Sequence, residues 1–226
     1  MKYKNILQEI NDCITFLIGK SIIHDQNYAH ISAETSCYRI TSCTPPSVLS
    51  FSNIDDYNII CDELRKNRQF TVLMFDNTMI NLEYQFKNDC IYKLRCLVLP
   101  DLRLYAGDEY YQDYSNSELN IELEFLQKYQ LKFPFRIDYD ISASKPGSHP
   151  KSHVHLGFSE GCRIPISVPL TPKIIFKFII ENFYNPTYIE LKNEFDNFFI
   201  LNQSNTFPKD IDILDKKKLF LDIDFT

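Results

Sequence analysis

The chain has 226 residues, 44% of them hydrophobic, so it can bury a sizeable core and lacks the composition of a disordered protein. Its formal net charge of -6 excludes a global basic field that would attract DNA or RNA, although a local basic strip can act within an acidic protein. The sequence has no G-x-G-x-x-G or Walker A pattern, which excludes the usual glycine-rich loops that bind nucleotide phosphates.

The N-terminal third of the chain predicts two helices with a β segment between them. Apolar side chains recur at helical spacing over residues 3–20, which indicates an amphipathic helix with one buried stripe. The segment 29–43 is rich in β-branched residues and predicts a strand or a hairpin. Residues 53–67 begin with acidic side chains and end with basic ones, as the helix dipole favours, and predict the second helix.

A run of β-forming segments follows, separated by turns rich in Asp and Asn, at 69–75, 79–86 and 90–100. These lengths and turns predict an antiparallel meander. Apolar residues alternate in the second segment, so we expect one face of the sheet to be buried and the other to be wet or to form a groove. Residues 105–118 are expected to form an exposed acidic loop, and residues 119–131 fit either a strand or a helix.

The C-terminal half predicts further strands and then helices. Strands are expected at 134–141, 153–158 and 162–168. A helix begins with Thr171 as N-cap and Pro172 at the first helical position, and Pro186 prevents its continuation. Residues 187–201 predict a further helix, and the charged tail at 208–226 predicts either an edge strand or a loose end.

We therefore predict one α+β domain over 1–226, an antiparallel curved β-sheet meander flanked by an N-terminal helix and a C-terminal helical portion. Its expected parts are a helix within 1–24, a mainly β region at 29–170, a helical region at 171–200 and a tail at 201–226. The seven scattered cysteines include no C-x-x-C pair, so we expect reduced thiols in a cytoplasmic protein. The charged N-terminus and the lack of a long apolar run predict neither a signal peptide nor a membrane span.

Ionisable residues concentrate in the segment 133–158. Three of the five histidines lie there, at His149, His153 and His155. Alternate residues of a strand share one face, so His153 and His155 are expected on the same side of their strand. Such a density of imidazoles marks this segment as the candidate site.

The strand before the histidines carries a matching set of polar groups. The same alternation places Arg136, Asp138 and Asp140 on one face and Tyr139 on the other. If the two strands pair with their polar faces aligned, two imidazoles meet two carboxylates and a guanidinium, and Arg163 can join from the next strand. A slip of one residue in the register would separate these groups.

Three chemistries fit this cluster. In the first, His153 and His155 act as general acid and base and arginines stabilise the developing charge, as in a metal-free ribonuclease or phosphodiesterase. In the second, His149, His153 and His155, with Asp138 or Asp140, hold a divalent metal that activates water. In the third, the cluster binds a small phosphorylated or other anionic ligand without reacting.

The residues therefore fall into two groups. The candidate catalytic residues are His149, His153, His155, Arg136, Asp138 and Asp140. The candidate ligand-binding residues are Arg163, Tyr139 and Lys151. A purely structural explanation also stays open, because an H-x-H pair can stand by chance on a solvated strand face and edge-strand carboxylates discourage aggregation.

The order of motifs "FRIDYD", "HPKSHVHLG", "CRIP" and "PLTP" over residues 133–185 resembles an uncharacterised bacterial family, domain of unknown function 2290. The resemblance implies a small cytosolic protein from mobile or defence-associated gene neighbourhoods, and it supplies no established catalytic residues. A strand with Arg and Asp followed by a His-rich segment is also similar to small toxin-like nuclease families.

The leading hypothesis is a small cytosolic nuclease-like effector of a bacterial toxin or antiphage defence system, which cleaves RNA or DNA at the 136–163 cluster. The low net basicity counts against it. The alternative is a non-catalytic subunit of a defence complex whose His/Arg face binds a ligand or a protein partner encoded nearby. A third hypothesis is a structural or antitoxin-like interaction protein.

Overall fold

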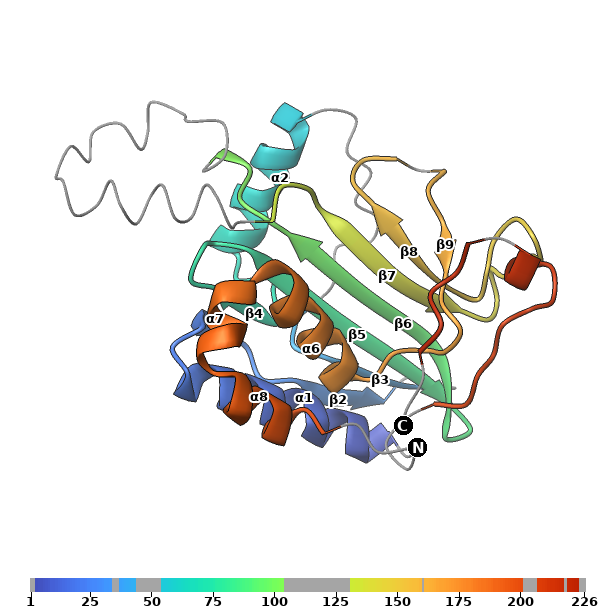
Figure 1. Cartoon of the computed structure of the whole chain (residues 1–226), viewed down its shortest axis with the longest axis horizontal. Helices are drawn as coiled ribbons and strands as arrows, with labels where there is room; N and C mark the ends of the chain where they lie inside the picture. Colours follow the sequence, from blue (N-terminus) through green and yellow to red (C-terminus); the bar gives the residue numbers. More distant parts are fainter. Residues whose placement is uncertain are drawn as a thin grey trace, which may run out of the picture.

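An antiparallel sheet forms the centre of the computed structural model, which describes residues 3–33, 37–43, 54–103, 131–159, 161–200, 207–217 and 219–223 (Figure 1). Within these residues the sheet has nine strands. The strands are β1 (Ile23–Gln26), β2 (His30–Ala33), β3 (Tyr38–Thr41), β4 (Val72–Met74), β5 (Met79–Lys87), β6 (Cys90–Leu99), β7 (Phe135–Asp140), β8 (Ser152–Leu156) and β9 (Ile164–Pro165). The helices are α1 (Tyr3–Gly19), α2 (Ile54–Lys66), α6 (Pro172–Phe183), α7 (Asn185–Glu190), α8 (Lys192–Phe198) and the short 3-10 helix η2 (Asp215–Lys217).

The predicted meander is confirmed, because β4, β5 and β6 pair in sequence order, and the same order continues through β7 and β8 to β9. The hairpin between β5 and β6 closes with the two-residue turn Asn88-Asp89, between the paired residues Lys87 and Cys90. Both turn residues have positive φ, 52° and 59°, which Asn and Asp tolerate and which matches the twist of the flanking strands. The predicted α+β class is also confirmed, since α1 precedes the strands in the chain and α6, α7 and α8 follow them.

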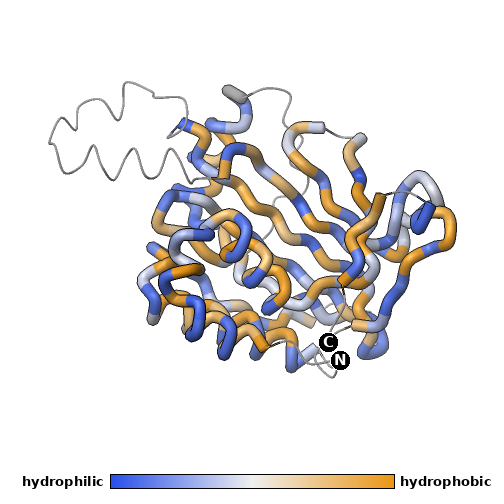
Figure 2. The backbone as a smooth tube through the Cα atoms, in the orientation of Figure 1, coloured by the Kyte–Doolittle hydropathy of each residue, from blue (hydrophilic) through white to orange (hydrophobic). Residues whose placement is uncertain are grey.

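The two faces of the sheet differ in chemistry because successive side chains of a strand point to opposite sides. On one face Tyr84, Leu94 and Ile137 belong to the main apolar core. On the other face Glu83 of β5 lies opposite Arg95 of β6. Figure 2 shows hydrophilic and hydrophobic positions alternating along the central strands. The sheet therefore buries one face fully and keeps a polar second face.

Helices α1 and α6 cover the apolar face. The fully buried stripe of α1 has the helical spacing expected from the sequence and consists of Ile6, Ile10, Cys13, Ile14 and Leu17. Helix α6 begins at Pro172 as predicted, although Thr171 makes no side-chain capping bond. Instead Glu9 of α1 accepts a hydrogen bond from the backbone N–H of Lys173 at 2.8 Å, which joins the two helices. Figure 1 shows α1 grouped with α6, α7 and α8.

Helix α2 packs over one end of the polar face through a second, smaller apolar cluster. Its Tyr57 and Leu64 contact a group that includes Leu97 and Leu99 of β6. The hydroxyl of Tyr57 donates a hydrogen bond to the carbonyl of Pro100 at 2.6 Å. This contact fixes α2 to the end of β6.

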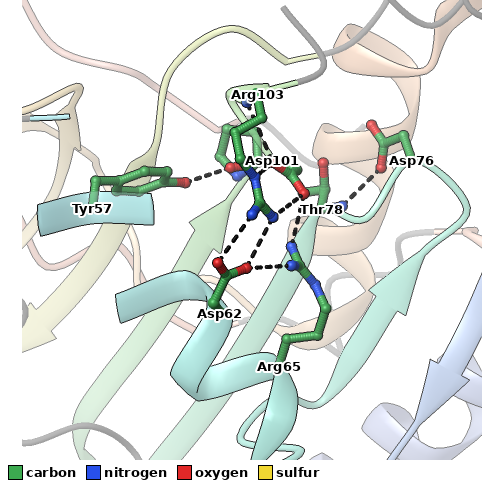
Figure 3. A network of polar contacts seen from close by, with 8 residues as sticks. Tyr57, Asp62, Arg65, Asp76, Thr78, Asp101 and Arg103 are labelled. Carbon is green, nitrogen blue, oxygen red and sulfur yellow. Dashed lines mark hydrogen bonds and ion pairs between the residues drawn. The ribbon is translucent and has the colours of Figure 1, made fainter. Parts of the chain in front are cut away.

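An ion-pair network strengthens the same junction (Figure 3). Asp101 follows β6, is 3% exposed, and accepts hydrogen bonds from Arg103 at 2.8 and 2.9 Å and from Arg65 of α2 at 3.1 Å. Both arginines also contact the exposed Asp62 of α2. Burial alone would raise the pKa of Asp101, but the hydrogen bonds and charges of Arg103 and Arg65 outweigh it and leave the pKa below its ordinary value.

Some elements differ from the sequence predictions. The structure contains strand β1, which the sequence analysis did not predict. Strand β9 has two residues, and Pro165 has no N–H with which to continue the ladder. The segment 187–201 contains most of two short helices instead of one, separated at Leu191. The predicted loop at 105–118 and most of 119–131 lie outside the described residues.

The C-terminal tail packs against the β8–β9 end of the sheet, so it is neither loose nor a regular edge strand. Leu221 forms an isolated parallel bridge with Ile166. Asp210 accepts hydrogen bonds from Tyr139 and Lys151, and the buried Asp215 accepts one from the backbone N–H of Gly147. The boundaries of a single domain stay a prediction. None of the helices in the described parts of the chain has the length and apolarity to cross a lipid bilayer.

We expect the change Asp101→Asn to lower the free energy of unfolding by about 2–3 kcal/mol, because it leaves two partly buried guanidiniums without their buried counter-charge. Urea denaturation followed by circular dichroism measures the loss. The matched control is Asp62→Asn, which touches the same arginines from an exposed position and should cost less than about 1 kcal/mol. Equal losses in the two variants would contradict this account of the α2 junction.

Candidate functional site

The pairing of β6, β7 and β8 assembles the predicted polar cluster. Asp138 of β7 has Arg95 of β6 and His153 of β8 as its direct cross-strand neighbours. Arg136, two residues earlier on β7, lies opposite His155. The alignment of polar faces that the sequence predicts for the two strands is therefore the register of the structure.

Three side chains of this cluster converge on one point, and we call them the His-His-Asp triangle: Asp138, His153 and His155. The Nε2 atoms of the two histidines are 2.9 Å apart. The Oδ2 atom of Asp138 lies 4.0 Å from Nε2 of His153 and 3.7 Å from Nε2 of His155. The residues are 7%, 1% and 7% exposed respectively, so bulk water hardly reaches them. Such a buried group of potential metal ligands is unusual on a sheet face that is otherwise partly solvated.

A backbone contact fixes the tautomer of His153. Its Nδ1 atom lies 2.8 Å from the carbonyl oxygen of Pro150. A carbonyl oxygen only accepts hydrogen bonds, so Nδ1 carries the proton and Nε2 of the neutral ring presents a lone pair. In this arrangement the N–H at Nε2 of His155 donates to that lone pair. The loop before β8 thus aims an unprotonated nitrogen at the centre of the triangle.

Two arginines hold the carboxylate of Asp138. Arg136 donates from Nε to Oδ2 at 2.6 Å, and Arg95 donates from Nε to Oδ1 at 3.4 Å. A buried carboxylate requires such partners, because an uncompensated charge in this environment is strongly unfavourable. The guanidiniums also restrict the rotation of the carboxylate and keep Oδ2 directed toward the two imidazoles.

The environment favours neutral histidines. Burial lowers the pKa of His153 to about 4, against the partial opposition of the nearby Asp138 carboxylate. Burial lowers the pKa of His155 to about 4 as well, with a further contribution from the positive charge of Arg136. At neutral pH both imidazoles are uncharged, and their nitrogens are available as bases or as metal ligands.

The polar face is locally basic although the whole chain is acidic. Around the triangle, the basic side chains on or beside the described strands β3 and β5–β9 outnumber the acidic ones: Arg39, Lys93, Arg95, Arg136 and Arg163 against Glu83, Asp138 and Asp140. The sequence interpretation missed Arg95, Arg39 and Glu83, because they come from strands far away in the chain. The spacing of Lys93 and Arg95, two residues apart, is the signal that could have indicated a second charged strand.

The other predicted site residues take different places. The ring of His149 lies 4.9 Å from that of His153, at the border of the triangle. Asp140 pairs with Lys93 at 3.1 Å and caps the following turn, so it is directed away from the histidines.

The predicted ligand-binding residues also separate. Tyr139 lies on the opposite, apolar face, where its hydroxyl binds Asp210, and Lys151 binds the same carboxylate. Arg163 directly precedes β9, and its positive charge contributes to the lowered pKa of both triangle histidines. Its Nε atom is buried and makes no hydrogen bond within the described residues. The Nε atom of Arg163 thus leaves a hydrogen bond unmade among the described residues, whereas the hydroxyl of Tyr139 is already bonded on the apolar face.

We expect acid to destabilise the protein through the two buried imidazoles. Their folded pKa is about 4, and that of an unfolded chain is about 6.5, so the unfolded state binds more protons in this interval. The free energy of unfolding should fall between pH 6.5 and pH 4 by about 1.4 kcal/mol per pH unit for each histidine. Urea denaturation at several pH values, with EDTA present, measures this slope.

The variant His153→Asn should remove the contribution of one histidine from the slope of the unfolding free energy against pH. Asn keeps a donor for the carbonyl of Pro150 but does not titrate. The control His30→Asn, at an exposed position on β2, should leave the slope unchanged. A pH slope that is the same in His153→Asn and in the unmodified chain would contradict the assignment.

Comparison with known proteins places this site in a family. A family model described as "Uncharacterized conserved protein (DUF2290)" matches residues 22–223. No curated protein and no solved structure matches the chain significantly. The matched region contains every described strand and the whole His-His-Asp triangle. The resemblance found in the sequence is thereby confirmed, and the chain belongs to the DUF2290 family of uncharacterised conserved proteins.

Proposed function

We propose that the protein is a nuclease-like hydrolase that cleaves phosphodiester bonds of RNA or DNA at the His-His-Asp triangle. The observation that carries the proposal is the convergence of two imidazole nitrogens and one carboxylate oxygen on a sheet face where guanidiniums outnumber carboxylates. Phosphodiester cleavage needs both a group that activates the attacking oxygen and cations that stabilise the charge developing on phosphorus.

Arginines would supply the cationic part of this mechanism. Guanidinium groups match phosphate oxygens with paired N–H donors and stay charged at any physiological pH. Arg163 is half-buried and its positive charge acts on both triangle histidines, so its guanidinium can stabilise the charge of a phosphate bound beside them. Arg136 lies opposite His155 and keeps further N–H groups beyond the one that binds Asp138. These two arginines come from the two sides of β8.

The imidazoles would supply the base. Nε2 of His153 carries a lone pair that its contact with Pro150 fixes. The N–H at Nε2 of His155 occupies this lone pair in the structure, so His153 would act as a base once that N–H has released it. A neutral imidazole can accept a proton from a water molecule or from a ribose hydroxyl as that oxygen attacks phosphorus. Asp138, whose Oδ2 atom lies 4.0 Å from Nε2 of His153, would stabilise the imidazolium that results.

A cytoplasmic setting in a bacterial toxin or antiphage defence system is part of the same proposal. The support for it is what the resemblance of the sequence motifs implies about gene neighbourhoods, since the matching family model describes an uncharacterised family. The local excess of basic groups answers the objection from the acidic net charge, because a nucleic acid meets the polar face and not the average of the surface.

A second candidate function is a non-catalytic binding subunit. The observation that favours it is the double ion pair of Asp138 with Arg136 and Arg95, which ties the carboxylate into the fold. Such a face would hold an anionic ligand or an acidic partner without reaction. Saturable binding of nucleic acid without any product would support this function over hydrolysis.

We expect the variants His155→Gln and His153→Asn to reduce cleavage of end-labelled single-stranded RNA or DNA by at least about 100-fold, because each removes a proton acceptor at the reacting centre. Gel electrophoresis of the products measures the rate, and circular dichroism verifies that the variants fold. The control is His30→Gln, an exposed histidine on β2, which should cleave like the unmodified chain. Cleavage that survives both triangle variants would refute the proposed active site.

A further inference from the structure

We infer that the His-His-Asp triangle is a binding site for one divalent transition-metal ion. The inference names a cofactor for the proposed hydrolase, yet it rests on the geometry of Asp138, His153 and His155 alone and stands or falls separately from cleavage. The sequence suggested His149, His153 and His155 as ligands, with Asp138 or Asp140. Of these, the described structure brings together Asp138, His153 and His155, with Asp138 directly across the strand pair from His153.

The size of the triangle matches the bonds of such an ion. Nε2 of His153, Nε2 of His155 and Oδ2 of Asp138 are separated by 2.9, 3.7 and 4.0 Å. A point equidistant from three atoms with these separations lies about 2.1 Å from each, and Zn–N and Zn–O bonds are roughly 2.0–2.2 Å long. One ion can therefore contact all three atoms without any movement of the strands.

The tautomer of His153 is already that of a metal ligand. Ligating histidines usually donate their second ring N–H to a carbonyl or carboxylate, which orients the ring and leaves the other nitrogen free. His153 makes this contact with the carbonyl of Pro150 at 2.8 Å. His155 needs one change, the transfer of its proton from Nε2 to Nδ1, so that both Nε2 lone pairs face the ion.

The ion pairs of Asp138 are compatible with ligation. A carboxylate oxygen has two lone pairs, so Oδ2 can accept the hydrogen bond of Arg136 and still bind a metal. Carboxylate ligands of metals are commonly held by such donors, which set their orientation. The ion would add positive charge near Arg136 and Arg95, and the buried carboxylate of Glu83, opposite Arg95, offsets part of it.

Two imidazoles and one carboxylate define the class of the ion. This donor set suits first-row transition ions such as Zn²⁺, Mn²⁺ or Fe²⁺, whereas Mg²⁺ and Ca²⁺ prefer oxygen ligands throughout. Sites with three protein ligands usually complete their coordination with water. When bound, the ion would occupy both Nε2 lone pairs and lower the pKa of such a water molecule, which would then supply the nucleophile for hydrolysis in place of the imidazole base.

The test uses the full chain, freed of metal with EDTA and then dialysed. Isothermal titration with ZnCl₂ and MnCl₂ should show one ion per chain, with Zn²⁺ binding more tightly than Mn²⁺ as the Irving–Williams order requires. MgCl₂ should show no binding of comparable affinity. Asp138→Asn and His155→Gln should each weaken Zn²⁺ binding more than tenfold, while the double variant His24→Gln/His30→Gln, at exposed positions, should keep it within about twofold.

Cobalt distinguishes the triangle from the free cysteines, such as the exposed Cys90, which also bind Zn²⁺. Co²⁺ should give visible ligand-field absorption without a near-ultraviolet thiolate charge-transfer band, and the absorption should disappear in His155→Gln. Absence of saturable binding, a thiolate band, or equal affinity in the triangle variants would overturn the inference.

Different experimental outcomes would reject the metal site and the proposed hydrolase. An ion bound at the triangle of a chain that cleaves no nucleic acid supports the metal site and removes the hydrolase. Cleavage that continues in EDTA and depends on His153 and His155, in a chain that binds no Zn²⁺ in the titration, keeps the hydrolase and overturns the metal site.

Discussion

The register between β7 and β8 is the constraint on which the rest of the site depends. It sets Asp138 opposite His153 and Arg136 opposite His155. A slip of one residue would turn the carboxylate toward the apolar core and bring Tyr139 to the polar face. The register is held from the other side of the sheet, where Ile137 and Val154 are also paired and both buried in the main core. Hydrophobic packing on one face thus fixes the ionisable groups on the other.

Burial then determines the properties of the groups that the register assembles. The histidines stay neutral because their charged forms would lose hydration, and the carboxylate of Asp138 accepts hydrogen bonds from guanidiniums on the strands around it. Arginines in a chain of net charge -6 are concentrated on this face. The same arrangement can attract an anion and offer it a base or a metal, which is why we propose hydrolysis of a phosphodiester in preference to a solvated structural face.

The sequence predicts the individual strands and helices of this fold better than it predicts which strands pair with one another. Strict alternation in "FRIDYD" and "HVHLG" is enough to place Arg136, Asp138, His153 and His155 on the correct faces, because it depends on local geometry alone. The contribution of Arg95 could not be predicted, since it depends on which distant strand pairs with β7. Local alternation did correctly separate Tyr139 from the acidic residues, although its assignment as a ligand contact does not fit a hydroxyl that binds Asp210 on the apolar face. The two short helices after α6 and the packing of the tail likewise follow from tertiary contacts.

The most direct test of the central claim is an NMR measurement on ¹⁵N-labelled histidine side chains at pH 7 in the presence of EDTA. We expect His153 to be neutral with its proton on Nδ1, and we expect a scalar coupling across the hydrogen bond between its Nε2 and Nε2 of His155, as their 2.9 Å separation requires. A His153 ring protonated at Nε2, or two histidines without coupling and in free exchange with water, would contradict the proposed assembly of the triangle.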